Sequence, residues 1–184
     1  MIDMRKILVW AAAAMLAAGE KLWPYHFDGY WRDVGTLDSF WEANIDLTNT
    51  DPQLDLYDTS WPIWTALPQR PPAKFVHNDS SRRGVAIESI VSNGCIISGE
   101  LNHAVVGSSC RIHSNAKVDY SVLAPRVTIG RGARVSRCII DTGVDIPAGM
   151  IIGEDTALDA KRFRRTDKGV TLVTREMMEK LGIK

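Results

Sequence analysis

The sequence lacks an excess of charge of either sign, a long hydrophobic run and a cysteine-rich pattern. It has 22 basic and 22 acidic residues among 184, so no global field draws the chain to nucleic acid or to an acidic membrane. Its three cysteines show no C-x-x-C spacing, which is typical of reduced thiols in a cytoplasmic protein. A hydrophobic content of 45% excludes a disordered chain and favours a globular core.

Residues 7–18 are almost wholly apolar, but a membrane span takes about 20 apolar residues. They follow a weakly basic start and end in Ala17-Ala18-Gly19, so a signal peptide is one interpretation. The other interpretation is a helix that stops at Gly19. A second helix is expected over Leu37–Leu47, and the prolines of residues 51–85 indicate turns and extended backbone.

Residues 86–155 contain a six-residue repeat that predicts the fold of most of the chain. Aliphatic residues recur six apart in sets of three, and equivalent members of successive sets are 17 residues apart. The nine positions are Val106, Ile112 and Val118, then Leu123, Ile129 and Val135, then Ile140, Ile146 and Ile152. A period of six fits neither an amphipathic helix nor a simple hairpin strand. It fits a three-sided solenoid whose inward side chains stack from coil to coil.

The residue two positions before each of these aliphatic residues is usually small and is also predicted to point inward. Cys95, Cys110 and Cys138 occupy such positions, so we interpret them as packing residues and not as ligands. A solenoid needs a cap at each end. The Pro-rich region is expected to cap one end. The amphipathic stretch Thr174–Leu181 is expected to cap the other, with Thr174 at its N-cap.

The repeat resembles the hexapeptide-repeat family, and this resemblance implies a left-handed parallel β-helix. Many members are acyltransferases, which use a histidine base and usually a loop that interrupts the repeat. No such insertion interrupts residues 106–152, and His103 and His113 are ten apart, which does not match a 17-residue coil. An acyltransferase is therefore the less favoured alternative, and satisfied or solvated histidines are expected instead of metal ligands.

A second signal lies in the segment Gly29–Thr36, where Asp33 is followed by Gly35 and Thr36. From the residues alone, Asp33 starts a turn and Thr36 caps the helix that begins at Leu37. Spacing by itself does not favour a catalytic role over this structural one.

Several motifs in one order resemble a known family. Y-W-R-D-V-G-T at 30–36 is similar to the W-x-D-V-G-T segment of sugar-nucleotide pyrophosphorylases. W-E-A-N-I-D-L at 41–47 resembles the W-x-A-N-x-D-L of bacterial ADP-glucose pyrophosphorylases, the glucose-1-phosphate adenylyltransferases. The resemblance continues through L-Y-D-T-S-W-P-I at 56–63, P-P-A-K-F at 71–75, D-A-K-R-F-R-R at 159–165 and V-T-R-E-M at 173–177. The chain thus resembles the C-terminal portion of this family.

The resemblance implies a reaction in which ATP and glucose 1-phosphate give ADP-glucose and pyrophosphate, a step of bacterial glycogen biosynthesis. The family holds a catalytic Mg²⁺ with two aspartates, and Asp33 matches the second, which makes it the candidate catalytic and metal-binding residue. Hard carboxylate oxygens suit Mg²⁺, and the ion neutralises the crowded phosphate oxygens. ATP and glucose 1-phosphate are therefore the expected substrates of the complete enzyme.

The resemblance also implies allosteric regulation by a phosphorylated metabolite or a nucleotide. Arg175 and Arg165 are the candidate effector-binding residues, with a solvated basic face as the alternative. Thr142 and Glu179 stand where relatives carry basic residues, so this chain departs from the family pattern there. The resemblance further implies a homo-oligomer, specifically a homotetramer, in the cytoplasm, and no nucleic-acid or membrane partner is expected.

The family's glycine-rich G-G-x-G-x-R-L loop, which cradles the ATP phosphates, has no counterpart before residue 30. We therefore expect residues 1–50 to be the truncated end of a nucleotidyltransferase domain, 51–85 a Pro-rich linker and 86–184 a β-helix domain with a C-terminal cap. The expected fold class is mainly β, a left-handed parallel β-helix preceded by a short α/β remnant. The chain is expected to serve oligomerisation and regulation and to be inactive alone. A stand-alone β-helix interaction module is the alternative.

Overall fold

The computed structural model describes residues 4–23, 25–63, 69–79 and 81–183. The chain divides into two compact units, Met1–Trp31 and Arg32–Lys184. The first unit contains helix α1 (Met4–Ala17), which ends where Gly19 adopts a φ of 79° and the Glu20 amide donates to the Met15 carbonyl. The predicted helix that stops at Gly19 is confirmed. Within the described ranges, no helix has the length and apolar character needed to cross a membrane.

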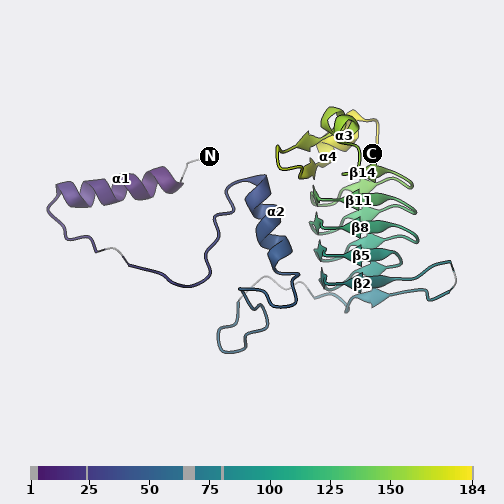
Figure 1. Cartoon of the computed structure of the whole chain (residues 1–184), viewed down its shortest axis with the longest axis horizontal. Helices are drawn as coiled ribbons and strands as arrows, with labels where there is room; N and C mark the ends of the chain where they lie inside the picture. The colour runs from purple at the N-terminus through teal and green to yellow at the C-terminus, as the bar shows by residue number, and fades with distance from the viewer. Residues whose placement is uncertain (1–3, 24, 64–68, 80, 184) are drawn as a thin grey trace. The chain divides into compact units, whose positions relative to one another are not determined.

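The second unit is a three-sided parallel β-helix, and its strands form three sheets (Figure 1). The first sheet contains β1 (Lys74–Phe75), β4 (Ile96–Ile97), β7 (Arg111–Ile112), β10 (Thr128–Ile129) and β13 (Asp145–Ile146). The second contains β2 (Val85–Ile87), β5 (Glu100–Asn102), β8 (Lys117–Asp119), β11 (Arg134–Ser136) and β14 (Ile151–Ile152). The third contains β3 (Ile90–Val91), β6 (Val105–Val106), β9 (Val122–Leu123), β12 (Cys138–Ile140), β16 (Thr171–Val173) and β15 (Arg164–Arg165).

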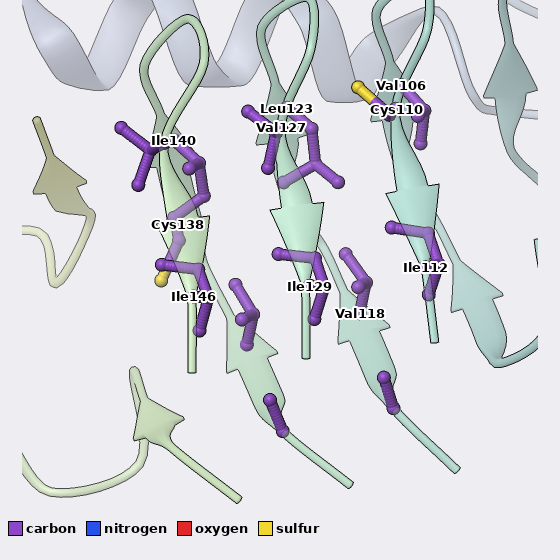
Figure 2. Packing of buried hydrophobic residues seen from close by; sticks show 14 of the residues in the cluster. Val106, Cys110, Ile112, Val118, Leu123, Val127, Ile129, Cys138, Ile140 and Ile146 are labelled. Atoms are coloured by element: carbon purple, nitrogen blue, oxygen red, sulfur yellow. The ribbon is translucent and has the colours of Figure 1, made fainter. Parts of the chain in front are cut away.

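The predicted columns of aliphatic side chains are present and in register. Val106 pairs with Leu123, which pairs with Ile140, and the other two columns pair in the same way. All nine positions are at most 2% exposed. Figure 2 shows Ile112, Ile129 and Ile146 in successive coils. The expected fold class, mainly β with a parallel β-helix, is confirmed.

One coil departs from the 17-residue spacing. Val91 pairs with Val106 and Ile97 with Ile112, so the first coil has a 15-residue step. The inward positions are kept because the shortening falls at a corner. In the same end coil, β1 adds a further strand below β4, so residues 74–75 of the Pro-rich region cap that end. Residues 64–68, also in that region, lie outside the described residues.

The corners of the coils use left-handed backbone, which most residues avoid. His103, Tyr120 and Arg137 occupy equivalent corners with φ values of 47°, 44° and 52°. Other corners are too crowded for a side chain. A Cβ on Gly130 would lie 2.5 Å from the Ala148 amide, and one on Gly153 would collide with the Ser136 carbonyl. Tight stacking between coils therefore sets where glycine is required.

Helix α2 (Leu37–Asp46) packs on the outer surface of the third sheet. Thr36 caps it, because the Ser39 amide donates to the Thr36 hydroxyl, as the sequence predicts. Trp41 and Ile45 of the helix share a buried cluster with outward residues of the sheet and its extension, Val122, Ile139 and Val170. In the described part of the chain, no strand precedes Lys74, so the region before the β-helix contains helices but not the strands of the predicted α/β remnant.

Two short helices and a hairpin close the far end of the β-helix (Figure 1). Helix α3 (Thr156–Arg162) begins at its N-cap Asp155, and α4 (Arg175–Lys180) begins at its N-cap Thr174. The helical cap predicted over Thr174–Leu181 is confirmed. Between them, β15 and β16 form an antiparallel hairpin whose second strand continues the third sheet by pairing with β12.

The closing helix α3 is held by a carboxylate inside the protein. Asp159 is fully buried and accepts from the Gly153 amide at 2.7 Å and from the Arg162 guanidinium at 2.6 Å. Arg162 also donates to the Ile151 carbonyl of β14. Asp159 and Arg162 thus satisfy backbone groups at the open edge of the last coil. Without these bonds, that edge would be available to pair with further strands.

Candidate functional site

The Asp33-containing segment, residues 32–36, lies at the start of α2 and contacts that helix. Arg32 forms an ion pair of 2.6 Å with Asp46 in the last turn of α2. The Gly35 amide donates to the Asp33 Oδ1 at 3.0 Å, which forms the turn that the sequence predicts at this position. Asp33 is an exposed residue.

The β15–β16 hairpin lies against the same helix. The Thr166 hydroxyl donates to the Asp38 carboxylate at 2.6 Å, and Lys168 forms an ion pair of 3.0 Å with Glu42. These residues are 128 and 126 positions apart in the sequence. The C-terminal part of the chain therefore contacts the Asp33-containing segment through α2.

A groove of about 690 Å³ lies between the Asp33-containing segment and the hairpin. We call it the hairpin groove. Val34, Gly35 and Thr36 line one part of it, and Arg164 and Arg165 line another. The structure therefore brings the candidate effector residue Arg165 beside the backbone that follows Asp33. The Arg165 guanidinium also donates to the Thr171 hydroxyl across the hairpin.

Arg175 lines a different groove, of about 560 Å³, which we call the α4 groove. Its guanidinium donates to the Gly143 carbonyl at 3.1 Å. Asp145 and Glu179 also line this groove, so it presents acidic groups beside the basic one. Thr142 directly precedes Gly143. The structure thus places the two candidate effector arginines in separate grooves.

A Mg²⁺ site requires several oxygen ligands in octahedral geometry. Asp33 supplies one hard carboxylate. Over residues 4–23, 25–63, 69–79 and 81–183, no group of three or more histidine, cysteine or acidic side chains is placed to hold a metal ion. The described residues therefore do not form a complete magnesium site, and Asp33 could serve only as one ligand among several.

The histidine and cysteine residues have structural environments. The His103 Nε2 lies 2.7 Å from a Glu88 carboxylate oxygen, and the His103 ring stacks on Tyr120 with ring centroids 4.5 Å apart. All three cysteines are buried free thiols. Burial raises the pKa of the Cys138 thiol. A hydrogen bond between the Cys95 and Cys110 thiols lowers the pKa of Cys95 and raises that of Cys110.

Sequence reasoning missed the contacts that attach α2. No defining motif position pointed to Asp38, Glu42, Thr166 or Lys168, and their pairing depends on a hairpin at the far end of the chain. One signal was available, because the outward positions of the third sheet are apolar. These positions are Ile90, Val105, Val122, Ile139 and Leu172. A row of outward apolar residues on one face of a solenoid indicates a covering element.

Comparison with protein families gives two matches, one over the β-helix and one over the region that precedes it. Residues 71–173 match the family described as GlmU-like, C-terminal hexapeptide, which agrees with the left-handed hexapeptide β-helix expected from the sequence. Residues 9–50 match the nucleotidyl transferase family. This second match contains α2 and the Asp33-containing segment.

Curated relatives from several bacteria are similar to the chain. Proteins named glucose-1-phosphate adenylyltransferase from Paramagnetospirillum magneticum and Granulibacter bethesdensis are 56% and 53% identical to it over 154 and 156 residues. A protein of the same name from Mesorhizobium japonicum is 52% identical over 157 residues. These matches cover 83–85% of this chain and 36–37% of the relatives. The chain therefore spans little more than a third of their length.

Proposed function

Because the chain belongs to the GlmU-like, C-terminal hexapeptide family and is related to nucleotidyltransferases, we propose that it is the β-helix portion of a glucose-1-phosphate adenylyltransferase. The observation that carries this proposal is the 56% identity to a protein of that name over 154 residues. In the complete enzyme, a phosphate oxygen of glucose 1-phosphate attacks the α-phosphorus of ATP. The bond from that phosphorus to the bridging oxygen breaks, and pyrophosphate leaves.

In this proposal Asp33 contributes one carboxylate to the magnesium site of the complete enzyme. A bound Mg²⁺ would supply charge neutralisation for the phosphate oxygens. The residues of this chain have the task of holding that carboxylate in place. The turn from Asp33 to Gly35 and the Arg32–Asp46 ion pair fix the backbone on either side of it. The remaining ligands and the phosphate-binding loop belong to a nucleotidyltransferase core.

We infer that the chain alone does not catalyse ADP-glucose formation, since its sequence contains no glycine-rich phosphate-binding loop. A pyrophosphate-release assay with ATP, Mg²⁺ and glucose 1-phosphate tests this. The chain alone should release no pyrophosphate. Co-expression with the N-terminal portion of the Paramagnetospirillum relative, up to where the match begins, should restore ADP-glucose formation. Turnover by the isolated chain would overturn the inference.

The role of Asp33 can be tested in the same co-expressed complex. Asp33→Asn keeps the shape of the side chain and the acceptor for Gly35 but removes the charge. Loss of a group that stabilises developing charge typically lowers kcat by 10²–10³-fold, so we expect a decrease of about 100-fold. The matched control is Asp51→Asn, an exposed aspartate beyond α2, which should leave kcat unchanged. Equal kcat for Asp33→Asn and the parent would contradict the assignment.

We further infer that the α4 groove is where a phosphorylated metabolite or a nucleotide regulates the complete enzyme. Arg175 supports this because its guanidinium lines a groove large enough for such a ligand and guanidinium suits phosphate. Asp145 and Glu179 in the same groove weaken binding of an anion. Removing one of them in Glu179→Gln should therefore tighten binding of inorganic pyrophosphate, measured by calorimetry, and Arg175→Ala should weaken it.

We also propose that the complete protein is a cytoplasmic homotetramer. The free thiols of Cys95, Cys110 and Cys138 support a reducing compartment, and the subunit number follows the family resemblance alone. Light scattering on the co-expressed complex tests the assembly state.

A stand-alone interaction module is the second candidate function, because both buried clusters lie within residues 37–183. Co-purification of the chain with an intact relative would favour it.

A further inference from the structure

The β15–β16 hairpin is an extension of the β-helix that makes polar contact with α2. Its second strand pairs with β12 of the solenoid, and the Arg137 guanidinium donates to the Lys168 carbonyl in its turn. The hairpin is therefore fixed to the coil beneath it and is not a free loop. Arg137 also lies 4.5 Å above the Trp41 ring of α2, so the same residue contacts both elements.

Thr166 connects the hairpin to the start of α2. Its hydroxyl donates to Asp38 at 2.6 Å and accepts from the Val170 amide at 3.1 Å. The hydroxyl thus acts both as a donor and as an acceptor. Asp38 lies in the first turn of α2, two residues after the N-cap Thr36. The bond therefore holds the end of the helix that adjoins the Asp33-containing segment.

A second contact holds the middle of the helix. Lys168 pairs with Glu42 one turn further along α2, and the Trp41 indole donates to the Tyr120 carbonyl at 2.7 Å. With Thr166 at the start of the helix, these contacts fix both its position and its rotation about its own axis. The Arg32–Asp46 ion pair and the Gly35–Asp33 turn then transfer that position to Asp33.

We propose that the β15–β16 hairpin positions Asp33 for metal binding, with Thr166 as the positioning residue that acts through Asp38. This rests on the proposed function of Asp33 and goes beyond it, because it assigns a role in the metal site to the far end of the β-helix. It predicts that the conformation of the hairpin, which leads within two residues into Arg175, sets the geometry of the Asp33 turn.

The experiment uses the full 184-residue chain labelled with ¹⁵N-glycine and follows the Gly35 amide, which donates to Asp33. Its resonance is identified by its loss in Gly35→Ala. Thr166→Val removes the hydroxyl and keeps the side-chain shape. A lost hydrogen bond typically changes a local equilibrium severalfold, so hydrogen exchange at Gly35 should become about fivefold faster. Thr166→Ser restores the hydroxyl and should return exchange to the parent value.

Asp38→Ala breaks the same bond from the helix side and should give the same acceleration. Combined with Thr166→Val it should add nothing further, since the bond between Thr166 and Asp38 is already lost in either single variant. The matched control is Thr128→Val, on the outer face of the first sheet, which should leave Gly35 unaffected. Unchanged exchange at Gly35 in Thr166→Val and in Asp38→Ala would overturn the proposal. So would a failure of Thr166→Ser to restore the parent rate.

The measurement needs no nucleotide, metal or turnover, so its result is independent of whether ADP-glucose is formed. If Thr166→Val accelerates hydrogen exchange at Gly35 but the co-expressed complex is inactive, the positioning role of Thr166 stands and the proposed enzymatic function is rejected. An active complex with Gly35 indifferent to Thr166 would do the reverse.

Discussion

At the scale of the residue, the stacked inward side chains fix the identity of each position most strictly. Ile129 is fully buried between Ile112 and Ile146. Burying a carboxylate there leaves it without a partner. We expect Ile129→Asp to destabilise the chain by at least about 4 kcal/mol, seen as loss of cooperative unfolding in urea. Ile129→Val should cost only about 1 kcal/mol, and an Ile129→Asp chain that melts like the parent would contradict the inward position.

The cysteines give a second expectation at this scale. Each thiol is at most 1% exposed, and thiolate is the reactive form. The raised pKa values of Cys110 and Cys138 keep them protonated at neutral pH. In the native chain these two should not react with Ellman's reagent over minutes, whereas all three should react at once in denaturant. Fast native labelling of Cys138 would mean that the last coils open.

At the scale of the element, the closing helix α3 depends on one buried carboxylate. Asp159→Ala removes the acceptor of both the Gly153 amide and Arg162. Breaking a largely buried ion pair is strongly destabilising, so we expect a loss of about 3 kcal/mol in urea unfolding. Lys161→Ala, on the exposed side of the same helix, is the control and should change stability by less than about 0.5 kcal/mol. Similar losses for both variants would contradict the role of Asp159.

The sequence predicts some of these elements well because their signals are local or periodic. The columns through Leu123 and Ile129 follow from a spacing that every coil repeats, and the cap at Thr174 follows from adjacent residues. The Asp33 turn was also predicted from its neighbours. The attachment of Asp38 to Thr166 was not, since it depends on two segments 128 residues apart that neither periodicity nor capping connects. Separation of Arg165 and Arg175 into two grooves was missed for the same reason.

At the scale of the whole molecule, residues 32–184 contain all of the buried clusters of the described chain. A chain that begins at Arg32 should therefore fold without the first unit. We expect its melting temperature to lie within about 2 °C of the parent, measured by circular dichroism, because the cooperative core is unchanged. A drop of 10 °C or more would show that the first unit stabilises the β-helix.

The arginine contacts at the end of the solenoid affect whether copies of the chain associate with one another. Arg162 and Arg175 donate to the carbonyls of Ile151 and Gly143, backbone groups of the last coil that would otherwise accept from an additional strand. Each coil resembles one layer of a cross-β fibril. A chain cut after Glu154 would expose that layer as a template, so copies would add end to end and the protein would accumulate as filaments or inclusion bodies. The C-terminal thirty residues thus prevent end-to-end self-association of the β-helix.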